Sequence, residues 1–414
     1  MIRPLYSLVL IGAQPLLRRK LRRRGAAEPG YLEHVEERFG SYDGPTEPGR
    51  LWIHAVSLGE TRAAAILLQA LRRAEPGLRV LLTHGTATGR AEGRRLLREG
   101  DAQAWLPWDT PAAVRRFLQH FRPSAGILME TEVWPNLAAQ CHALGIPLAL
   151  ANARLSEKSL VQARRLARLS RPAYGALRAV WAQTEKDARR LAQAGATVQG
   201  VFGNLKFDAS PDPALLAQGR DWRSTAPHPV VMFASSREGE EREFLQAIAA
   251  QRRIQWLLVP RHPQRFDEVA ALAVQAGFTV SRRSAWDDAP APAQLWIGDS
   301  LGEMPLYYAL ADAALLGGSF APLGGQNLIE AAACGCPVVM GPHTFNFSEA
   351  AELAREAGAA RRVANMQEGV RAAAELVRDR QARARAVQAS EEFAAAHRGA
   401  AEKTAAAVLR LLPS

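Results

Sequence analysis

The chain has 414 residues, which is too long for one ordinary domain and suits two domains of about 200 residues each. Hydrophobic residues make up 48% and charged residues 22%, values typical of a globular protein rather than a disordered or fibrous one. The net charge of +11 favours an anionic partner, such as nucleic acid, an acidic lipid surface or a phosphorylated substrate. Three cysteines are too few for a disulfide framework, which predicts a reducing compartment.

The N-terminus combines an apolar stretch with a basic cluster. Residues 5–17 are largely apolar, and six of the seven residues from 18 to 24 are basic. The apolar stretch is shorter than the ~20 residues that span a bilayer, and Pro15 interrupts it. An apolar segment followed by arginines is typical of anchoring on an anionic leaflet. We therefore expect residues 1–30 to associate with the cytoplasmic face of a membrane; the alternative is an ordinary helix that packs on the domain.

From residue 51, short apolar runs alternate with helix-length segments, which predicts parallel, doubly wound sheets. A proline-bearing stretch, 209–229, separates two series of runs. We therefore expect two Rossmann-like α/β domains, 31–212 and 213–414, that face a cleft between the halves, with ligands bound there beyond the carboxyl ends of the strands. The expected strands are 51–56, 79–84, 104–109, 125–130, 147–153 and 179–184 in the first half, and 230–235, 254–260, 294–299, 313–319 and 337–341 in the second.

The stretch from Gly298 to Pro342 reads as strand, helix, strand, glycine-rich loop, helix and strand. Asn327 is expected to open the last helix, which ends at Gly335. A glycine loop that leads into a helix N-terminus presents backbone N–H groups to an anion. The order of elements resembles the nucleotide-sugar half of glycosyltransferases that are built from two facing Rossmann-like domains.

Polar residues follow several of the expected strands. Ser57-x-x-Glu60 has the spacing of a capping box, in which the glutamate stabilises a helix start. Ser300-x-x-Glu303 and Asn327-x-x-Glu330 have the same spacing, so helix capping is the simple structural explanation for all three glutamates. Cys334 and Cys336 lack further ligands at a suitable spacing, and we expect them to be small buried residues rather than a metal site.

Six motifs in order carry a closer resemblance: HAVSLGE, METEVWPNL, GNLKFD, VPRHPQRF, GDSLGEMPLYYALADAALLGGS and GGQNLIEAAACGCPVVMGP. Together they resemble the Kdo transferase family of Gram-negative bacteria, which moves 3-deoxy-D-manno-octulosonic acid (Kdo) from CMP-Kdo to a lipid A precursor. The resemblance covers most of the chain and implies the GT-B arrangement of two Rossmann-like domains. Small departures are Leu58, Leu301 and Gln326, the last at a position where the family pattern has histidine.

The resemblance implies specific roles for residues in the first half. The glutamate that matches Glu60 is the general base of the family, and an ionised glutamate can accept the proton of a sugar hydroxyl. The resemblance gives Glu130 and Lys206 supporting roles at the transition state, with Glu132 in reserve. The alternative explanations are helix N-terminal charge for the glutamates and a solvated surface position for the lysine.

The resemblance also implies a CMP-binding set in the second half. Arginine grips phosphate through two charge-assisted hydrogen bonds, so Arg261 is the main candidate for the nucleotide phosphate. No Asp-x-Asp pair lies in a suitable loop, and we expect neither a metal nor a cofactor. The donor-binding residues implied are Arg261, His262, Leu301, Gly302, Glu303, Asn327, Leu328, Ile329 and Glu330.

The sequence thus predicts an inverting, metal-independent glycosyltransferase that moves Kdo from CMP-Kdo to a lipid A precursor in lipopolysaccharide inner-core synthesis. Its expected place is the cytoplasmic face of the inner membrane, against anionic lipid. One alternative is a GT-B enzyme that uses a UDP- or ADP-sugar. A basic nucleic-acid-binding protein is a remote alternative, because the common nucleic-acid motifs and aromatic-rich basic stripes are missing from the sequence.

Overall fold

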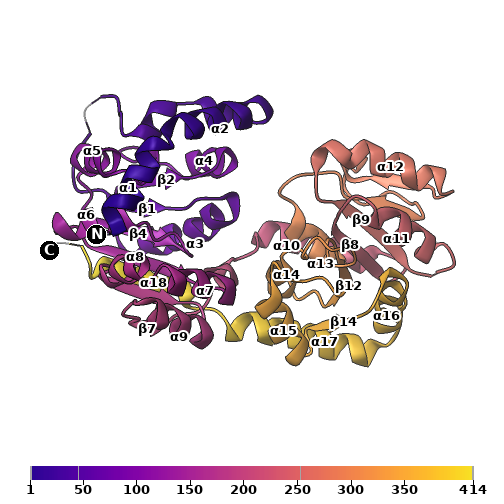
Figure 1. Cartoon of the computed structure of the whole chain (residues 1–414). Helices are drawn as coiled ribbons and strands as arrows, with labels where there is room; N and C mark the ends of the chain where they lie inside the picture. The colour runs from indigo at the N-terminus through magenta and orange to yellow at the C-terminus, as the bar shows by residue number, and fades with distance from the viewer. Residues whose placement is uncertain (1, 45, 252, 413–414) are drawn as a thin grey trace. The chain divides into compact units, whose positions relative to one another are not determined.

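A computed structural model describes residues 2–44, 46–251 and 253–412, and it divides into two compact units (Figure 1). The first unit runs to Asp208 and also includes the stretch from Arg398 onward; the second unit is Ala209–His397. Within the described residues, each unit contains one seven-stranded sheet in which all pairings are parallel. The prediction of two Rossmann-like α/β domains is therefore confirmed.

The sheet of the first unit has the strand order β3-β2-β1-β4-β5-β6-β7. The first six positions reproduce the order of a dinucleotide-binding fold, in which the chain reverses direction across the sheet between β1 and β4. The strands are β1 (Leu51–His54), β2 (Val80–His84), β3 (Ala102–Trp105), β4 (Ala125–Met129), β5 (Leu148–Ala153), β6 (Ala179–Ala182) and β7 (Gly200–Val201).

Helices cover both faces of this sheet because successive residues of each buried strand point to opposite sides. Leu51 and Ile53 of β1 pack in a core on one face, whereas Trp52 packs in a core on the other. The helices of this unit are α1 (Ile2–Gly12), α2 (Gln14–Ala27), α3 (Leu58–Ala74), α4 (Ala87–Arg94), α5 (Pro111–Phe121), α6 (Pro135–Ala143), α7 (Glu157–Arg165), α8 (Ala167–Gly175), α9 (Glu185–Ala194) and α18 (Ala400–Leu409).

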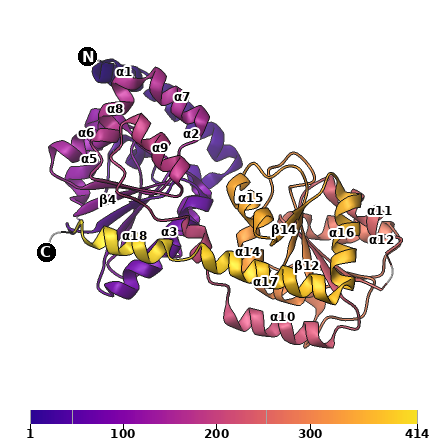
Figure 2. The same ribbon diagram turned by 90° about the horizontal axis from the view of Figure 1, so that it is seen from below.

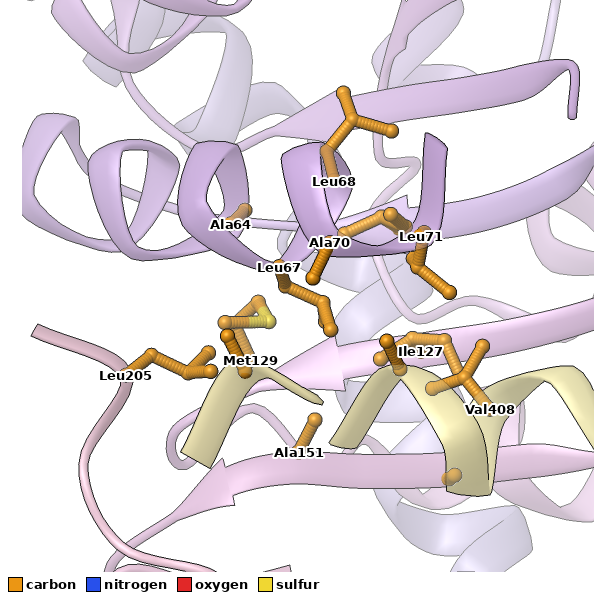
Figure 3. Packing of buried hydrophobic residues seen from close by; sticks show 14 of the residues in the cluster. Ala64, Leu67, Leu68, Ala70, Leu71, Ile127, Met129, Ala151, Leu205 and Val408 are labelled. Atoms are coloured by element: carbon orange, nitrogen blue, oxygen red, sulfur yellow. The ribbon is translucent and has the colours of Figure 1, made fainter. Parts of the chain in front are cut away.

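The last helix, α18, belongs to the first unit, although the sequence analysis assigned all of 213–414 to the second. Figure 3 shows Val408 of α18 beside Leu71 of α3 and Ile127 of β4, and all three are fully buried. The carboxylate of Asp208 also accepts the backbone N–H groups of Gly399 and Ala401, at 2.5 and 2.7 Å, at the start of this helix. An apolar face and a capped N-terminus thus fix the end of the chain on the first sheet.

The sheet of the second unit has the order β10-β11-β9-β8-β12-β13-β14. Its strands are β8 (Val230–Ser236), β9 (Gln255–Pro260), β10 (Val280–Arg282), β11 (Leu295–Ile297), β12 (Ala313–Leu316), β13 (Val338–Met340) and β14 (Ala360–Arg362). Its helices are α10 (Pro213–Thr225), α11 (Glu240–Ile248), α12 (Phe266–Gln275), α13 (Met304–Leu310), α14 (Leu328–Ala333), α15 (Ser348–Glu356), α16 (Met366–Arg378) and α17 (Arg380–Ala396), which Figure 2 shows from below.

Helix α1 contacts the rest of the first unit through polar side chains, and α2 packs its buried Leu21 against Tyr31 and Phe39. The hydroxyl of Tyr6 donates to Asp109 at 3.0 Å, and the Asn136 amide donates to Ser7 Oγ at 3.0 Å. The apolar side chains Leu5, Leu8, Val9 and Leu16 remain 62–68% exposed. None of the helices within the described residues has the length and apolar character that crossing a bilayer requires.

Candidate active site

Glu60 lies in the first turn of α3, directly after β1. Ser57 is the N-cap residue, and its Oγ accepts the backbone N–H of Glu60 at 3.4 Å. In return, the Glu60 carboxylate accepts the N–H of Val56 at 2.8 Å and the hydroxyl of Ser57 at 3.2 Å. The capping geometry expected from the sequence is therefore present, and it holds the carboxylate at the carboxyl end of β1.

Burial raises the pKa of Glu60 to about 7, and the charges of Glu130 and Glu132 act in the same direction, while the N–H of Val56 opposes them. Burial also raises the pKa of Glu132. A glutamate that only caps an exposed helix keeps a low pKa, because water solvates its carboxylate. A carboxylate that titrates near neutral pH can instead accept and release a proton under cellular conditions.

Glu130 directly follows β4 and has a strained conformation. Its φ of +59° lies in the left-handed region, which residues other than glycine rarely adopt. Its side chain is only 3% exposed, and the carboxylate accepts the Arg154 Nε–H at 2.7 Å. The Lys206 Nζ lies 3.6 Å from the other oxygen of the same carboxylate. The sequence motifs that contain Glu130 and Lys206 are therefore joined in space by an ion pair.

Asn152 positions the segment that carries Lys206. It is the last but one residue of β5 and has a left-handed φ of +51°, and its side-chain oxygen accepts the N–H of Leu205 at 3.1 Å. Lys206 lies in the short 3₁₀ helix η3 (Leu205–Asp208), where its own N–H donates to Asn204 at 3.0 Å. Sequence reasoning missed Asn152 and Arg154. Their only signal was a position at the carboxyl end of an expected strand.

In the second unit, Arg261 and His262 directly follow β9. The N–H of Arg261 donates to the carbonyl of Ser236, at the end of the neighbouring strand β8, at 3.0 Å. Burial lowers the pKa of His262, and the nearby charges of Arg237, Arg261 and Arg265 lower it further. Cationic groups therefore gather at the carboxyl ends of β8 and β9, as an anion-binding site requires.

The glycine-rich loop after β12 lies at the same edge of the sheet. Gly318 has a φ of +70°, and a Cβ on Gly317 would lie 2.2 Å from the carbonyl oxygen of Ser235. Asn327 caps α14 and accepts the N–H of Ile329 at 3.2 Å, as the capping pattern predicted. Leu328 and Ile329 are each 1% exposed, so neither side chain is presented to solvent at this helix start.

The capping box expected at Ser300-x-x-Glu303 is not formed. Helix α13 begins at Met304 with Glu303 in the cap position, and the Ser300 hydroxyl donates to the Glu303 carboxylate. Glu303 also accepts Arg283 Nη2–H at 2.8 Å. Leu301 is 73% exposed and Gly302 has a φ of +84°, so the segment forms an exposed turn before the helix.

Glu240 is a functional candidate that sequence reasoning missed. It is 2% exposed at the start of α11, and burial raises its pKa. Its carboxylate accepts four backbone N–H groups at 2.8–3.1 Å: those of Arg237, Gly318, Phe320 and Ala321. One buried side chain therefore fixes the glycine-rich loop to the turn after β8.

The structure thus forms two groups of the predicted residues, one in each unit. Glu60, Glu130 and Lys206 share the edge of the first sheet where β1, β4 and η3 meet. The predicted donor-binding residues follow β9, β11 and β12 of the second sheet. Cys334 and Cys336 are buried, and both are free thiols.

Comparison with known proteins gives consistent results. Residues 33–209 match the family model described as 3-Deoxy-D-manno-octulosonic-acid transferase (kdotransferase). The 3-deoxy-D-manno-octulosonic acid transferase of Bordetella pertussis is 49% identical, with 97% of each chain covered. The protein of the same name from Haemophilus influenzae is 31% identical, with 96% of each chain covered. The crystal structure of Anabaena HepE with UDP matches in fold, with a TM-score of 0.58, 16% identity and coverage of 88% of this chain and 100% of that one.

Proposed function

The chain belongs to the 3-deoxy-D-manno-octulosonic acid (Kdo) transferase family, and on that premise we propose that it moves Kdo from CMP-Kdo to a hydroxyl of a lipid A precursor. It is a glycosyltransferase of lipopolysaccharide biosynthesis. The observation that carries this conclusion is the 49% identity over 97% of the chain. The donor, the acceptor and the residue roles below are our proposal.

Glu60 acts as the general base. Its pKa of about 7 leaves a substantial ionised fraction at neutral pH, and a base whose pKa matches the working pH is effective. The carboxylate takes the proton of the acceptor hydroxyl as that oxygen attacks the anomeric carbon of Kdo. The bond from that carbon to the phosphate breaks on the opposite side, so the configuration is inverted and CMP leaves.

Lys206 and Glu130 support this step. The Lys206 ammonium neutralises the sugar carboxylate or the departing phosphate, and its ion pair with buried Glu130 fixes its position. Arg154 donates to the same glutamate at 2.7 Å and helps to hold its carboxylate in place. An ion pair that is held before the reaction needs no reorganisation as charge develops.

The second unit binds the nucleotide. Arg261 and His262 contact the phosphate, the turn from Leu301 to Glu303 borders the nucleotide, and Asn327 and Glu330 hold the ribose side through the start of α14. A single phosphate that leaves as CMP needs less neutralisation than a diphosphate. Arginine and backbone N–H groups can supply it, so we propose no metal for this reaction.

The N-terminal helices place the enzyme on the cytoplasmic face of the inner membrane. Exposed Leu5, Leu8 and Val9 of α1 are available to enter the lipid surface. The basic residues that follow in α2, at 18–24, suit an anionic leaflet. Both features support residence beside a bilayer-borne acceptor.

The alternatives are less well supported. Fold similarity to a UDP complex at 16% identity concerns the fold alone and does not favour a UDP-sugar donor. The net charge of +11 is also explained by an anionic lipid surface and a phosphorylated donor, so a nucleic-acid partner is not needed.

One assay tests the proposal. Purified protein is incubated with CMP-Kdo and a detergent-dispersed, tetra-acylated lipid A precursor, and the products are resolved by mass. We expect acceptor bearing Kdo and release of CMP. A parallel reaction with UDP-sugars should give no product. Transfer from UDP-sugars but not from CMP-Kdo would contradict the proposed donor.

A further inference from the structure

Arg237 lies at the point of the second sheet where the chain reverses the direction in which it adds strands. Strand β8 is the first strand of that sheet, and it lies between β9 and β12. The chain places β9, β10 and β11 on one side of β8 before it returns to add β12 on the other, and ligands of open α/β sheets bind at such switch points. Arg237 directly follows β8, as Arg261 directly follows β9.

A bulge at the end of β8 shapes this position. The pairing of β8 with β9 shifts between Ala234 and Ser236, and Ser235 adopts a left-handed φ of +55°. Bulges and strained non-glycine residues gather next to functional sites, where they redirect a side chain. Past the bulge, the Cγ of Arg237 lies 3.7 Å from the point that a Cβ on Gly318 would occupy. The side chain therefore lies against the glycine-rich loop.

The backbone at Arg237 is fixed to that loop. The N–H of Arg237 donates to Glu240 Oε2 at 3.0 Å, and the N–H of Gly318 donates to the same oxygen at 2.8 Å. One buried carboxylate thus sets the distance between the arginine and the loop before any ligand binds. Such preorganisation lowers the cost of binding.

Its guanidinium group remains available. Within the described part of the chain, the Arg237 side chain makes no hydrogen bond or ion pair, although the residue is half-buried. Arg265 nearby differs, because it donates to Glu241 at 2.7 Å and pairs with Glu268 at 3.1 Å. The lowered pKa of His262 is consistent with positive charge gathered here. These positive charges repel one another, and a bound anion would offset the repulsion.

We propose that Arg237 binds the phosphate of the nucleotide donor, together with Arg261 on the neighbouring strand end. This inference rests on the proposed function and adds a phosphate contact to it. When the sugar leaves, the phosphodiester becomes a phosphate monoester, and a second negative charge develops on its oxygens. A guanidinium at this position therefore binds the leaving group more tightly than the intact donor, which is the requirement for a faster reaction.

The test compares wild type with Arg237→Gln, Arg237→Lys and a matched control, Arg371→Gln. Arg371 is an exposed arginine on α16 of the same unit. Calorimetric titration with CMP and with cytidine, which lacks phosphate, separates a phosphate contact from a general loss of structure. Thermal unfolding is recorded for every variant.

We expect Arg237→Gln to weaken CMP binding about 10- to 100-fold and to leave cytidine binding unchanged. Arg237→Lys should recover part of the loss, and Arg371→Gln should match wild type. In transfer assays, kcat should fall for Arg237→Gln by more than KM rises. Equal CMP affinity in Arg237→Gln and wild type would overturn this inference alone, as would equal losses for CMP and cytidine. Wild-type protein that binds no CMP would overturn the proposed donor as well.

Discussion

Replacing Glu60 with glutamine tests whether Glu60 is a structural cap or a general base. The two side chains differ only in that glutamine has a neutral amide in place of the carboxylate. Glutamine keeps a carbonyl oxygen that can accept the Val56 N–H, now at 2.8 Å from the carboxylate. Its NH₂ can donate to Ser57 Oγ, which lies 3.2 Å from the other carboxylate oxygen. The capping contacts can therefore survive the substitution, and only the charge and the basicity are lost.

The sign of the stability change follows from the pKa. The folded-state pKa of Glu60, about 7, lies above the ordinary glutamate value. Its contribution to stability is therefore fully present below the ordinary pKa and is lost as pH rises through about 7. A shift of this size corresponds to about 3 kcal/mol, or about 1–3 kcal/mol when partial exposure is considered. Glutamine avoids this loss, although it forgoes about 0.3–1 kcal/mol of interaction with the helix dipole.

Wild type should lose about 1–3 kcal/mol of stability as the pH is raised from 5 to 8, and Glu60→Gln should not. The variant should therefore become more stable relative to wild type by that amount over this pH range. Glu185→Gln is the matched control, since it removes an exposed acid from the first turn of α9 in the same unit. That control should lose only the dipole contribution of about 0.3–1 kcal/mol. Denaturant unfolding at both pH values measures the difference.

Activity should respond in the opposite direction. Wild-type transfer should rise with pH through about 7 as Glu60 ionises. Single-turnover transfer by Glu60→Gln should be at least about 100-fold slower, and its residual rate should not follow that profile. Near wild-type transfer by a folded Glu60→Gln protein would refute the assignment as base. A wild-type rate that does not change between pH 6 and pH 8 would refute the argument from burial.

Three further predictions concern other parts of the chain. Arg261→Ala should weaken CMP binding about 10- to 100-fold without changing the melting temperature, and unaltered affinity in calorimetry would remove Arg261 from the site. Replacing exposed Leu8 and Val9 with serine should reduce sedimentation with anionic vesicles at least about tenfold, and unchanged sedimentation would argue against membrane contact through α1. Gly317→Ala should destabilise the protein by about 1–3 kcal/mol, because its Cβ would lie 2.2 Å from the Ser235 carbonyl oxygen; an unchanged denaturation midpoint would contradict this.

The sequence predicted the central strands well, because buried parallel strands such as β4 and β12 are uninterrupted apolar runs. It missed β7, β10 and β14, which have only two or three residues and carry no comparable run. It also placed the third strand at 104–109, whereas β3 is Ala102–Trp105. The apolar run there continues past the strand into the turn that leads to Asp109.

The residues near the candidate chemistry were predicted unevenly. Glu60 and Asn327 stand in recognisable motifs with capping spacing, and the structure gives each the local geometry expected. Arg154 was not predicted because its role depends on an ion pair with Glu130, 24 positions earlier in the chain. Glu240 bonds to backbone N–H groups about 80 positions away, and backbone donors leave no trace in the residue pattern.

Glu60 and Glu240 occupy corresponding positions in the two units, and we propose a different role for each. Each follows the first strand of its sheet, at the switch point, and each lies near the start of the next helix. The Glu240 carboxylate accepts four backbone N–H groups, which uses its full capacity of about four lone pairs. It can therefore only hold the loop. Glu60 accepts one backbone N–H and one hydroxyl, so it keeps the capacity to accept a proton from a substrate. The two switch points therefore differ in the number of fixed donors, as the proposed roles of Glu60 as base and Glu240 as loop anchor require.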